Sequence, residues 1–299
     1  MVNGKAEELP QRKKKNKFKK ENESSIRAYE SLISKLLKNP NSPIFIKRKV
    51  VGLIFFIWYY ILMKKNPYPG KFIVIEGLDG SGKSTQSKLL ISHLKKEGYK
   101  TAIIDFPQYG TKSAGLVEEY LNGKYGTSEE VGSYRASIFY TCDRYDASFK
   151  IRKWLKEGKV VISDRYVASN IGHQGGKIKN KKERKKFLKW LYNLEYNIFG
   201  IPKPDITFIL KTSPKLAREM APKITDKDKK RKRIAYLGRK ISDTHERDLR
   251  HLTQALNSYL ETAKEFPREF KVIESMENNK FIPPKIIHQK IWRIIKIIL

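Results

Sequence analysis

One glycine-rich stretch, residues 71–85, constrains this chain more than any other feature, and it reads KFIVIEGLDGSGKST. It contains the pattern G-x-x-x-x-G-K-S, formed by Gly77, Gly82, Lys83 and Ser84, directly after a short apolar run. Glycines allow the backbone to turn tightly, so that successive N–H groups point inward at a phosphate. In such a loop the lysine reaches the β- and γ-phosphates, and the serine hydroxyl binds Mg²⁺.

The stretch also has the flanking elements that this loop requires. Residues 72–75 are apolar and predict a buried strand, and residues 85–94 predict a helix with three leucines on one face. The N-terminus of that helix adds its own attraction for anions. A glycine-rich turn without a ligand is the alternative, but the order of strand, loop and helix argues against it. We therefore predict an ATP site formed by Gly77, Leu78, Asp79, Gly80, Ser81, Gly82, Lys83, Ser84 and Thr85.

From about Tyr68 to the end of the chain, strand-like and helix-like segments alternate. This alternation is typical of an α/β fold with a parallel sheet flanked by helices. The predicted strands are residues 72–75, 101–105, 160–163, 206–210 and 271–273. Isoleucines at helical spacing in residues 284–299 predict a closing core helix rather than a membrane helix. We expect one P-loop NTPase domain of about five strands over residues 67–299.

The first 66 residues form a separate N-terminal extension with a different composition. Residues 1–41 are polar and basic and predict a disordered tail, with an option for a helix over 25–38. Within residues 42–66, the uncharged run 50–63 is shorter than the hydrocarbon core of a bilayer. The alternatives for it are attachment to a membrane surface with snorkelling lysines, packing against protein, or a true span. We expect a cytoplasmic protein, with membrane association through residues 50–63 as an option.

The chain is strongly basic, with 63 Lys+Arg against 31 Asp+Glu and a formal net charge of +32. This excess suits nucleic acid, acidic lipid or nucleotide phosphates as partners. A general compositional bias is the alternative, which the even spread of lysines along the chain favours. Cys142 is the only cysteine, so one chain can form neither a disulfide nor a cysteine-based zinc site. This cysteine content fits a reducing cytosol.

Further candidate site residues lie at and after the predicted strands. Asp164 and Arg165 follow strand 160–163, at the carboxyl edge that lines the ligand crevice of an open parallel sheet. Asp164 could hold the water shell of Mg²⁺ and Arg165 a phosphate, with an ordinary ion pair as the alternative. Tyr140 and Arg144 are four residues apart and share a face of a predicted helix. They could stack on a base and bond its edge, or be a core aromatic beside a surface arginine.

In combination, the segments GLDGSGKST, FPQYG, FYTCDRYDAS, DRYVASNIGHQGG and IPKPD resemble the thymidylate kinase family, in order and in spacing, over residues 71–299. The resemblance implies a nucleoside monophosphate kinase fold with a mobile lid and a homodimer. It also implies transfer of the γ-phosphoryl group of Mg·ATP to dTMP, in the biosynthesis of dTTP. The alternatives are another nucleoside monophosphate or deoxynucleoside kinase on this fold, and a basic P-loop protein that binds nucleic acid. The sequence has no RNA-binding aromatic signature, which argues against the last.

The resemblance also implies roles for individual residues. Lys83 would follow the transferring phosphoryl group, Asp79 would lie near the acceptor, Arg165 would hold the acceptor phosphate, and Ser84 and Asp164 would lie at the metal. The implied dTMP pocket consists of Phe106, Pro107, Tyr109, Tyr140, Arg144, Arg165, Ser169, Asn170, His173 and Gln174. In it, Tyr140 would stack on thymine and Arg144 would bond a thymine carbonyl. His173 stands where many members have tyrosine, at the wall that favours deoxyribose.

The resemblance further bears on the source of the catalytic positive charge. Position 80 is arginine in one branch of the family and glycine here, so we expect a cation from the lid, residues 214–248. A lid cation that closes over the γ-phosphoryl group would exclude water and neutralise developing charge. The catalytic candidates in this segment are Arg231, Arg233 and Arg239.

Overall fold

The protein is described here by a computed structural model that covers residues 66–221 and 249–299, which belong to one compact unit, Asn66–Leu299. Several predictions from the sequence fall outside these described residues. They are the basic tail 1–41, the hydrophobic segment up to residue 65, and lid residues 222–248 with Arg231, Arg233 and Arg239.

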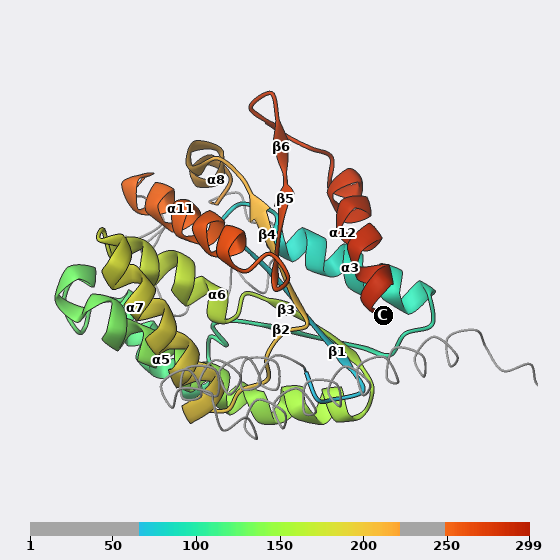
Figure 1. The fold of residues 1–299 in the computed structure, drawn as a ribbon, viewed down its shortest axis with the longest axis horizontal. Helices are drawn as coiled ribbons and strands as arrows, with labels where there is room; N and C mark the ends of the chain where they lie inside the picture. The colour runs from blue at the N-terminus through green and yellow to red at the C-terminus, as the bar shows by residue number, and fades with distance from the viewer. Residues whose placement is uncertain (1–65, 222–248) are drawn as a thin grey trace, which may run out of the picture. The chain divides into compact units, whose positions relative to one another are not determined.

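Five parallel strands form the centre of the unit (Figure 1). They are β1 (Lys71–Gly77), β2 (Thr101–Asp105), β3 (Val160–Asp164), β4 (Ile206–Lys211) and β5 (Phe270–Glu274). The order across the sheet is β2-β3-β1-β4-β5. All five predicted strands are confirmed. The central strand β1 pairs with β3 in a register that sets Ile75 opposite Asp164, so the P-loop and the segment after β3 leave the sheet side by side.

Helices cover both faces of the sheet (Figure 1). The α-helices are α3 (Lys83–Lys96), α4 (Gly115–Leu121), α5 (Ser128–Lys156), α6 (Val167–Ser169), α7 (Lys181–Tyr192), α8 (Pro214–Met220), α11 (Leu249–Glu265) and α12 (Pro284–Ile298). The short 3-10 segments are η1 (Lys112–Ala114) and η3 (Gly175–Lys177), and the π-helical segments are η2 (Asn170–Gln174) and η4 (Asn193–Ile198). Three helices predicted within the described residues are therefore confirmed: 85–94 as α3, the helix that carries Tyr140 and Arg144 as α5, and 284–299 as α12.

The side chains of β1 alternate between two hydrophobic cores, as expected for a strand with both faces covered. Phe72 and Val74 join the core that α5, α7 and α11 cover, whereas Ile73 and Ile75 join the core under α3 and α12. In the second core α12 contributes Ile287, Ile291 and Ile295, all buried. The closing helix is thus a core helix, as its spacing predicted.

Three details were not predicted from the sequence. Gly132 has a non-helical conformation (φ 73°, ψ 165°) near the start of α5, so this long helix is broken close to its capping box at Thr127. The π-helical segments η2 and η4 replace regular helix after α6 and α7. A hairpin of β6 (Met276–Glu277) and β7 (Lys280–Phe281) follows β5.

Within the described ranges, no helix combines the length and apolar character needed to cross a bilayer.

Candidate active site

The P-loop connects β1 to α3 and turns sharply at its glycines. Gly82 is the N-cap of α3 and has a φ of 91°, a left-handed backbone conformation that residues other than glycine rarely adopt. Lys83, the first residue of α3, is buried, and its Nζ donates to the carbonyl oxygen of Leu78 at 2.8 Å. The same Nζ lies 3.6 Å from Oδ1 of Asp79. The loop thus holds a cation and a carboxylate at the N-terminus of a helix, which suits a phosphate ligand.

Gly80 lies in close contact with α8. A Cβ at this position would lie 2.3 Å from the carbonyl oxygen of Ala217 and 2.8 Å from the backbone nitrogen of Ala221. Both atoms belong to the backbone, so only a shift of α8 would create space. The structure therefore gives a physical reason why this loop lacks arginine at position 80. It also shows that the first residues of the predicted lid form a helix packed on the P-loop.

Arg165 extends from the end of β3 toward the P-loop. Its backbone has a φ of 71°, an uncommon value for a residue other than glycine, and its N–H donates to the carbonyl oxygen of Ile75 at 2.9 Å. Its guanidinium forms an ion pair with Asp79. Nη1 donates to Oγ of Ser169 at 3.3 Å and faces Nε2 of His173 at the same distance. The structure thus brings Arg165 and Lys83 together at Oδ1 of Asp79.

Charges dominate this cluster. Burial opposes ionisation of Asp79, but the neighbouring Arg165 and Lys83 hold the pKa of its carboxyl far below the ordinary value. Burial and the charge of Arg165 lower the pKa of Lys83. Asp79 raises the pKa of Arg165 well above its usual value despite burial. The site therefore combines two cations with one ionised carboxylate.

Glu76 is a functional candidate that sequence reasoning missed. It is fully buried in β1, next to the P-loop. Its Oε1 accepts hydrogen bonds from the N–H groups of Tyr166 (2.7 Å) and Ser169 (3.0 Å), and its Oε2 accepts from the hydroxyls of Ser169 (2.9 Å) and Tyr259 (3.1 Å). Burial raises the pKa of this carboxyl, against the lowering effect of Arg165 and the hydrogen bonds. Glu76 thus fixes the segment that carries Arg165 and Ser169. A lone acid in an apolar strand was the available signal.

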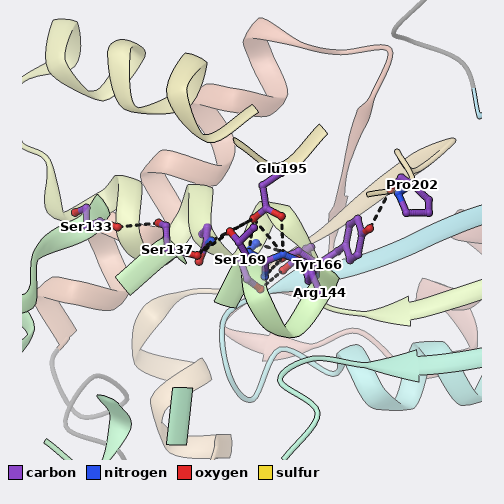
Figure 2. Close-up of polar contacts among 10 residues, drawn as sticks. Ser133, Ser137, Arg144, Tyr166, Ser169, Glu195 and Pro202 are labelled. Carbon is purple, nitrogen blue, oxygen red and sulfur yellow. Dashed lines mark hydrogen bonds and ion pairs between the residues drawn. The ribbon is translucent and has the colours of Figure 1, made fainter. Parts of the chain in front are cut away.

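Arg144 and Glu195 form a buried ion pair beside this segment (Figure 2). Nε of Arg144 is 3.1 Å from each carboxylate oxygen of Glu195, and Nη2 contacts Oε1 as well. Nη1 is 3.5 Å from the carbonyl oxygen of Tyr166. Thr141 donates to Oε1 of Glu195 at 2.8 Å. Sequence reasoning missed Glu195, and the role of Arg144 at a thymine edge stays a prediction.

The other predicted pocket residues lie at the same edge of the sheet or on α5. Phe106 follows β2, and its N–H donates to the carbonyl oxygen of Asp164 at 3.0 Å. The centroid of its ring lies 5.6 Å from the ring centroid of Tyr166. Pro107 and Tyr109 continue this loop. The buried carboxylate of Asp143, which no sequence motif marked as functional, holds this loop by accepting from the N–H of Gln108 at 2.9 Å.

Tyr140 lies half-buried on α5, with its ring edge against that of Tyr120. Two pocket candidates lie buried in η2. Nδ2 of Asn170 donates to the carbonyl oxygen of Ser137 at 3.2 Å, and Oε1 of Gln174 accepts from Lys177 at 2.8 Å. The fold therefore gathers all the predicted pocket residues on the β2 loop, α5 and the segment after β3. Their individual contacts to a nucleotide stay predictions.

The predicted metal residues come from two neighbouring elements. Ser84 lies in the first turn of α3, and Asp164 ends β3, beside β1 in the sheet. Residues 66–221 and 249–299 contain no cluster of three or more His, Cys, Asp or Glu side chains that could hold a metal. A hydroxyl and one carboxylate fit Mg²⁺, which usually keeps several waters and binds through substrate phosphates rather than in an all-protein cage.

A P-loop on the central strand of a parallel sheet, with an arginine after the adjacent strand, defines a P-loop nucleotide kinase. Residues 75–286 match the family model for thymidylate kinase. The chain thus belongs to the thymidylate kinase family, which is a family of phosphotransferases, as its motifs predicted.

Individual relatives agree with this assignment. The chain is 32% identical to the thymidylate kinase of Plasmodium falciparum over 52% of this chain and 68% of the relative. It is 32% identical to the thymidylate kinase of Mycobacterium tuberculosis, over 55% of this chain and 76% of the relative. It is 31% identical to a probable thymidylate kinase of Thermococcus kodakarensis, over 72% of this chain and 95% of the relative. The solved thymidylate kinase of Candida albicans has the same fold, with a TM-score of 0.55 and 24% identity over 76% of this chain and 91% of that one.

Proposed function

We propose that this chain transfers the γ-phosphoryl group of ATP to dTMP, producing ADP and dTDP. The observation that carries the proposal is the meeting of Lys83 and Arg165 at Asp79. Lys83 belongs to the donor loop, and Arg165 follows the adjacent strand, where the acceptor phosphate is expected. Two cations on one carboxylate provide neighbouring places for two phosphate groups. This is the arrangement that phosphoryl transfer between them needs.

The residues act by positioning and by charge. The acceptor phosphate oxygen is already an anion at neutral pH, so neither a covalent intermediate nor a strong base is required. Lys83 neutralises donor phosphate charge, Arg165 orients the acceptor, and Asp79 holds both cations within reach of the transferring group. Ser84 and Asp164 would hold Mg²⁺, which would supply further neutralisation of phosphate charge. The lid is predicted to enclose the site, and its residues 222–248 lie outside the described residues.

The base pocket follows from the same proposal. Phe106 and Pro107 form one wall, Tyr140 stacks on thymine, and Ser169 lies beside the sugar. Arg144 bonds the thymine edge through Nη1, since Glu195 occupies Nε and Nη2 and, among the described residues, Nη1 makes only one long contact, to the carbonyl oxygen of Tyr166. His173 lies against Arg165, so its imidazole forms the wall nearest the phosphate.

We further propose that the protein is a homodimer. Ile138, Tyr145 and Phe149 share one face of α5 and are 38%, 40% and 59% exposed. Exposed apolar side chains in one stripe support an interface with a second copy. Attachment to a membrane surface in the cytoplasm, through residues 50–63, is a prediction about a segment outside the described residues.

A coupled ADP-release assay tests the function. Purified protein with Mg·ATP would be offered dTMP, dUMP, UMP and thymidine in parallel, with Lys83→Ala as the inactive control. We expect turnover with dTMP and a much lower kcat/KM with the other three. A preference for UMP or thymidine would overturn the base-pocket assignment but keep the P-loop kinase. The absence of turnover with every acceptor would overturn the proposed function.

A further inference from the structure

Two histidines connect Arg165 to helix α11. The rings of His173 in η2 and His251 in α11 are stacked, with centroids 5.6 Å apart and an angle of 27° between planes. Nδ1 of His173 lies 3.3 Å from Nε2 of His251, and Nε2 of His173 lies 3.3 Å from Nη1 of Arg165. Asp79, Arg165, His173 and His251 therefore form one continuous row of polar contacts. His251 has no role in the function proposed above.

The chemistry of these groups fixes the direction of every hydrogen bond in the row. A guanidinium has only donors, so Nε2 of His173 must accept from Arg165. In a neutral imidazole the other nitrogen then carries the proton, so Nδ1 of His173 donates to Nε2 of His251. Nε2 of His251 is therefore the acceptor, and the proton of the His251 ring is on Nδ1.

The surroundings keep the ring of His173 neutral. Burial and the positive charge of Arg165 lower the pKa of His173 well below its usual value; His251 and Lys83 act in the same direction, and Asp79 opposes them. On the side of α8, Ala217 packs against α11, while Lys215, Arg218 and Glu219 are exposed. Tyr259, one of the closest groups on α11, presents its ring to His173 at 6.1 Å.

The contact between η2 and α11 is tight enough to define the geometry of the pair. A Cβ on Gly172, the residue before His173, would lie 2.3 Å from the ring of Tyr259. His251 itself is only 7% exposed. Rigid packing of this kind is what a positioning partner requires, because a group that is loosely held cannot fix another.

We propose that His251 is a positioning residue of the phosphate-transfer site: by accepting the Nδ1 proton of His173, it fixes the tautomer that presents a lone pair to Arg165. The inference rests on the proposed function, in which Arg165 holds the acceptor phosphate. In the other tautomer an N–H of His173 would face the N–H groups of Arg165, and the guanidinium would lose one of its acceptors. Outer partners of this kind orient the groups that touch a ligand.

Kinetics of two variants test the proposal. His251→Leu removes the acceptor, whereas His251→Gln offers an amide oxygen near the position of Nε2. We expect His251→Leu to raise KM for dTMP by roughly tenfold, the scale on which an outer partner acts, with KM for ATP unchanged. His251→Gln should recover most of this loss. The matched control is His288→Leu. His288 on α12 belongs to a second imidazole pair, in which its Nε2 lies 2.8 Å from Nδ1 of His93 on α3. The kinetic constants of this variant should equal those of the wild type.

Nitrogen-15 NMR of the imidazoles provides a readout that does not depend on activity. The wild type should show His173 protonated on Nδ1, and His251→Leu should lose this preference. A wild-type His173 protonated on Nε2 would overturn the proposal, and so would equal KM values for dTMP in His251→Leu and the wild type. A folded His251→Gln as impaired as His251→Leu would also overturn it, since packing alone would then explain the effect. A wild type inactive toward dTMP but with the expected tautomer would overturn only the proposed function.

Discussion

Arg144 and Glu195 form an ion pair in which neither side chain reaches solvent, with exposures of 1% and 0%. The pair joins α5, which carries Tyr140 and Arg144 of the predicted base pocket, to the π-helical segment η4. Removal of two charges from water is costly, and the pair offsets that cost only while both partners are present. Its geometry therefore links the shape of the base pocket to the stability of the fold.

Loss of one partner of this pair should destabilise the protein strongly. We expect Glu195→Ala to lower the free energy of unfolding by about 3–5 kcal/mol, because it leaves the Arg144 guanidinium buried and uncompensated. Urea denaturation followed by circular dichroism measures the change. The double variant Arg144→Met with Glu195→Leu is the control and should recover much of the loss. A Glu195→Ala protein as stable as the wild type would contradict the buried ion pair.

The two cations at Asp79 should be needed for turnover but not for folding. Arg165→Ala should reduce the rate by on the order of 10³-fold, the scale of an arginine that contacts a transferring phosphoryl group. Lys83→Ala should have an effect at least as large. Arg268→Ala, an exposed arginine before β5, is the matched control and should keep full activity. Near-normal turnover in folded Arg165→Ala would remove Arg165 from the acceptor site.

The neutral state of His173 should make stability depend on pH. Burial and Arg165 lower the pKa of His173 in the folded protein. As pH falls, the unfolded chain therefore binds a proton at this residue at a higher pH than the folded protein does. Stability is then fully present above pH 6.5 and falls as pH drops below it, by at most about 1.4 kcal/mol per pH unit for this one group. His173→Gln should show a shallower loss of stability between pH 7 and 5 in urea titrations. An unchanged slope would mean that His173 titrates normally.

The apolar stripe on α5 should control oligomeric state. Phe149 is 59% exposed and packs edge-on against Tyr145, so a charge in this stripe would oppose burial against a second copy. We expect Phe149→Asp to lower the molecular mass measured by sedimentation equilibrium from that of a dimer to that of a monomer. Lys153→Asp, an exposed change one turn further along α5, tests whether charge alone has this effect. A wild-type protein that sediments as a monomer would exclude the proposed dimer.

The elements that depend on local patterns were predictable from the sequence. Apolar runs defined the five strands, isoleucine spacing defined α12, and the glycine pattern located the P-loop and Lys83. Asp164 and Arg165 were recognised because parallel strands end at a common edge. These signals lie within a few residues of the features that they predict.

The parts that were missed depend on contacts between distant segments. Glu195 is 51 residues from Arg144, and no local pattern marks a glutamate in η4 as the partner of a particular arginine. His251 is 78 residues from His173, and only the packing of α11 on η2 brings the rings together. Glu76 differs from these cases, because a single acid inside an apolar strand is a visible anomaly.

The contact of Gly80 with α8 has a consequence for how such a site changes in evolution. Arginine within the loop and the cation predicted for the lid are two ways to place the same charge, but a single Gly80→Arg substitution would not produce the first arrangement here. Arginine at position 80 would collide with the backbone at Ala217 and Ala221. Helix α8 would have to shift before the new charge became useful, and the chain would lose loop packing before it gained a cation. Exchange of one arrangement for the other therefore passes through a variant in which the P-loop and α8 pack poorly, and we expect a lineage to keep whichever arrangement it inherited.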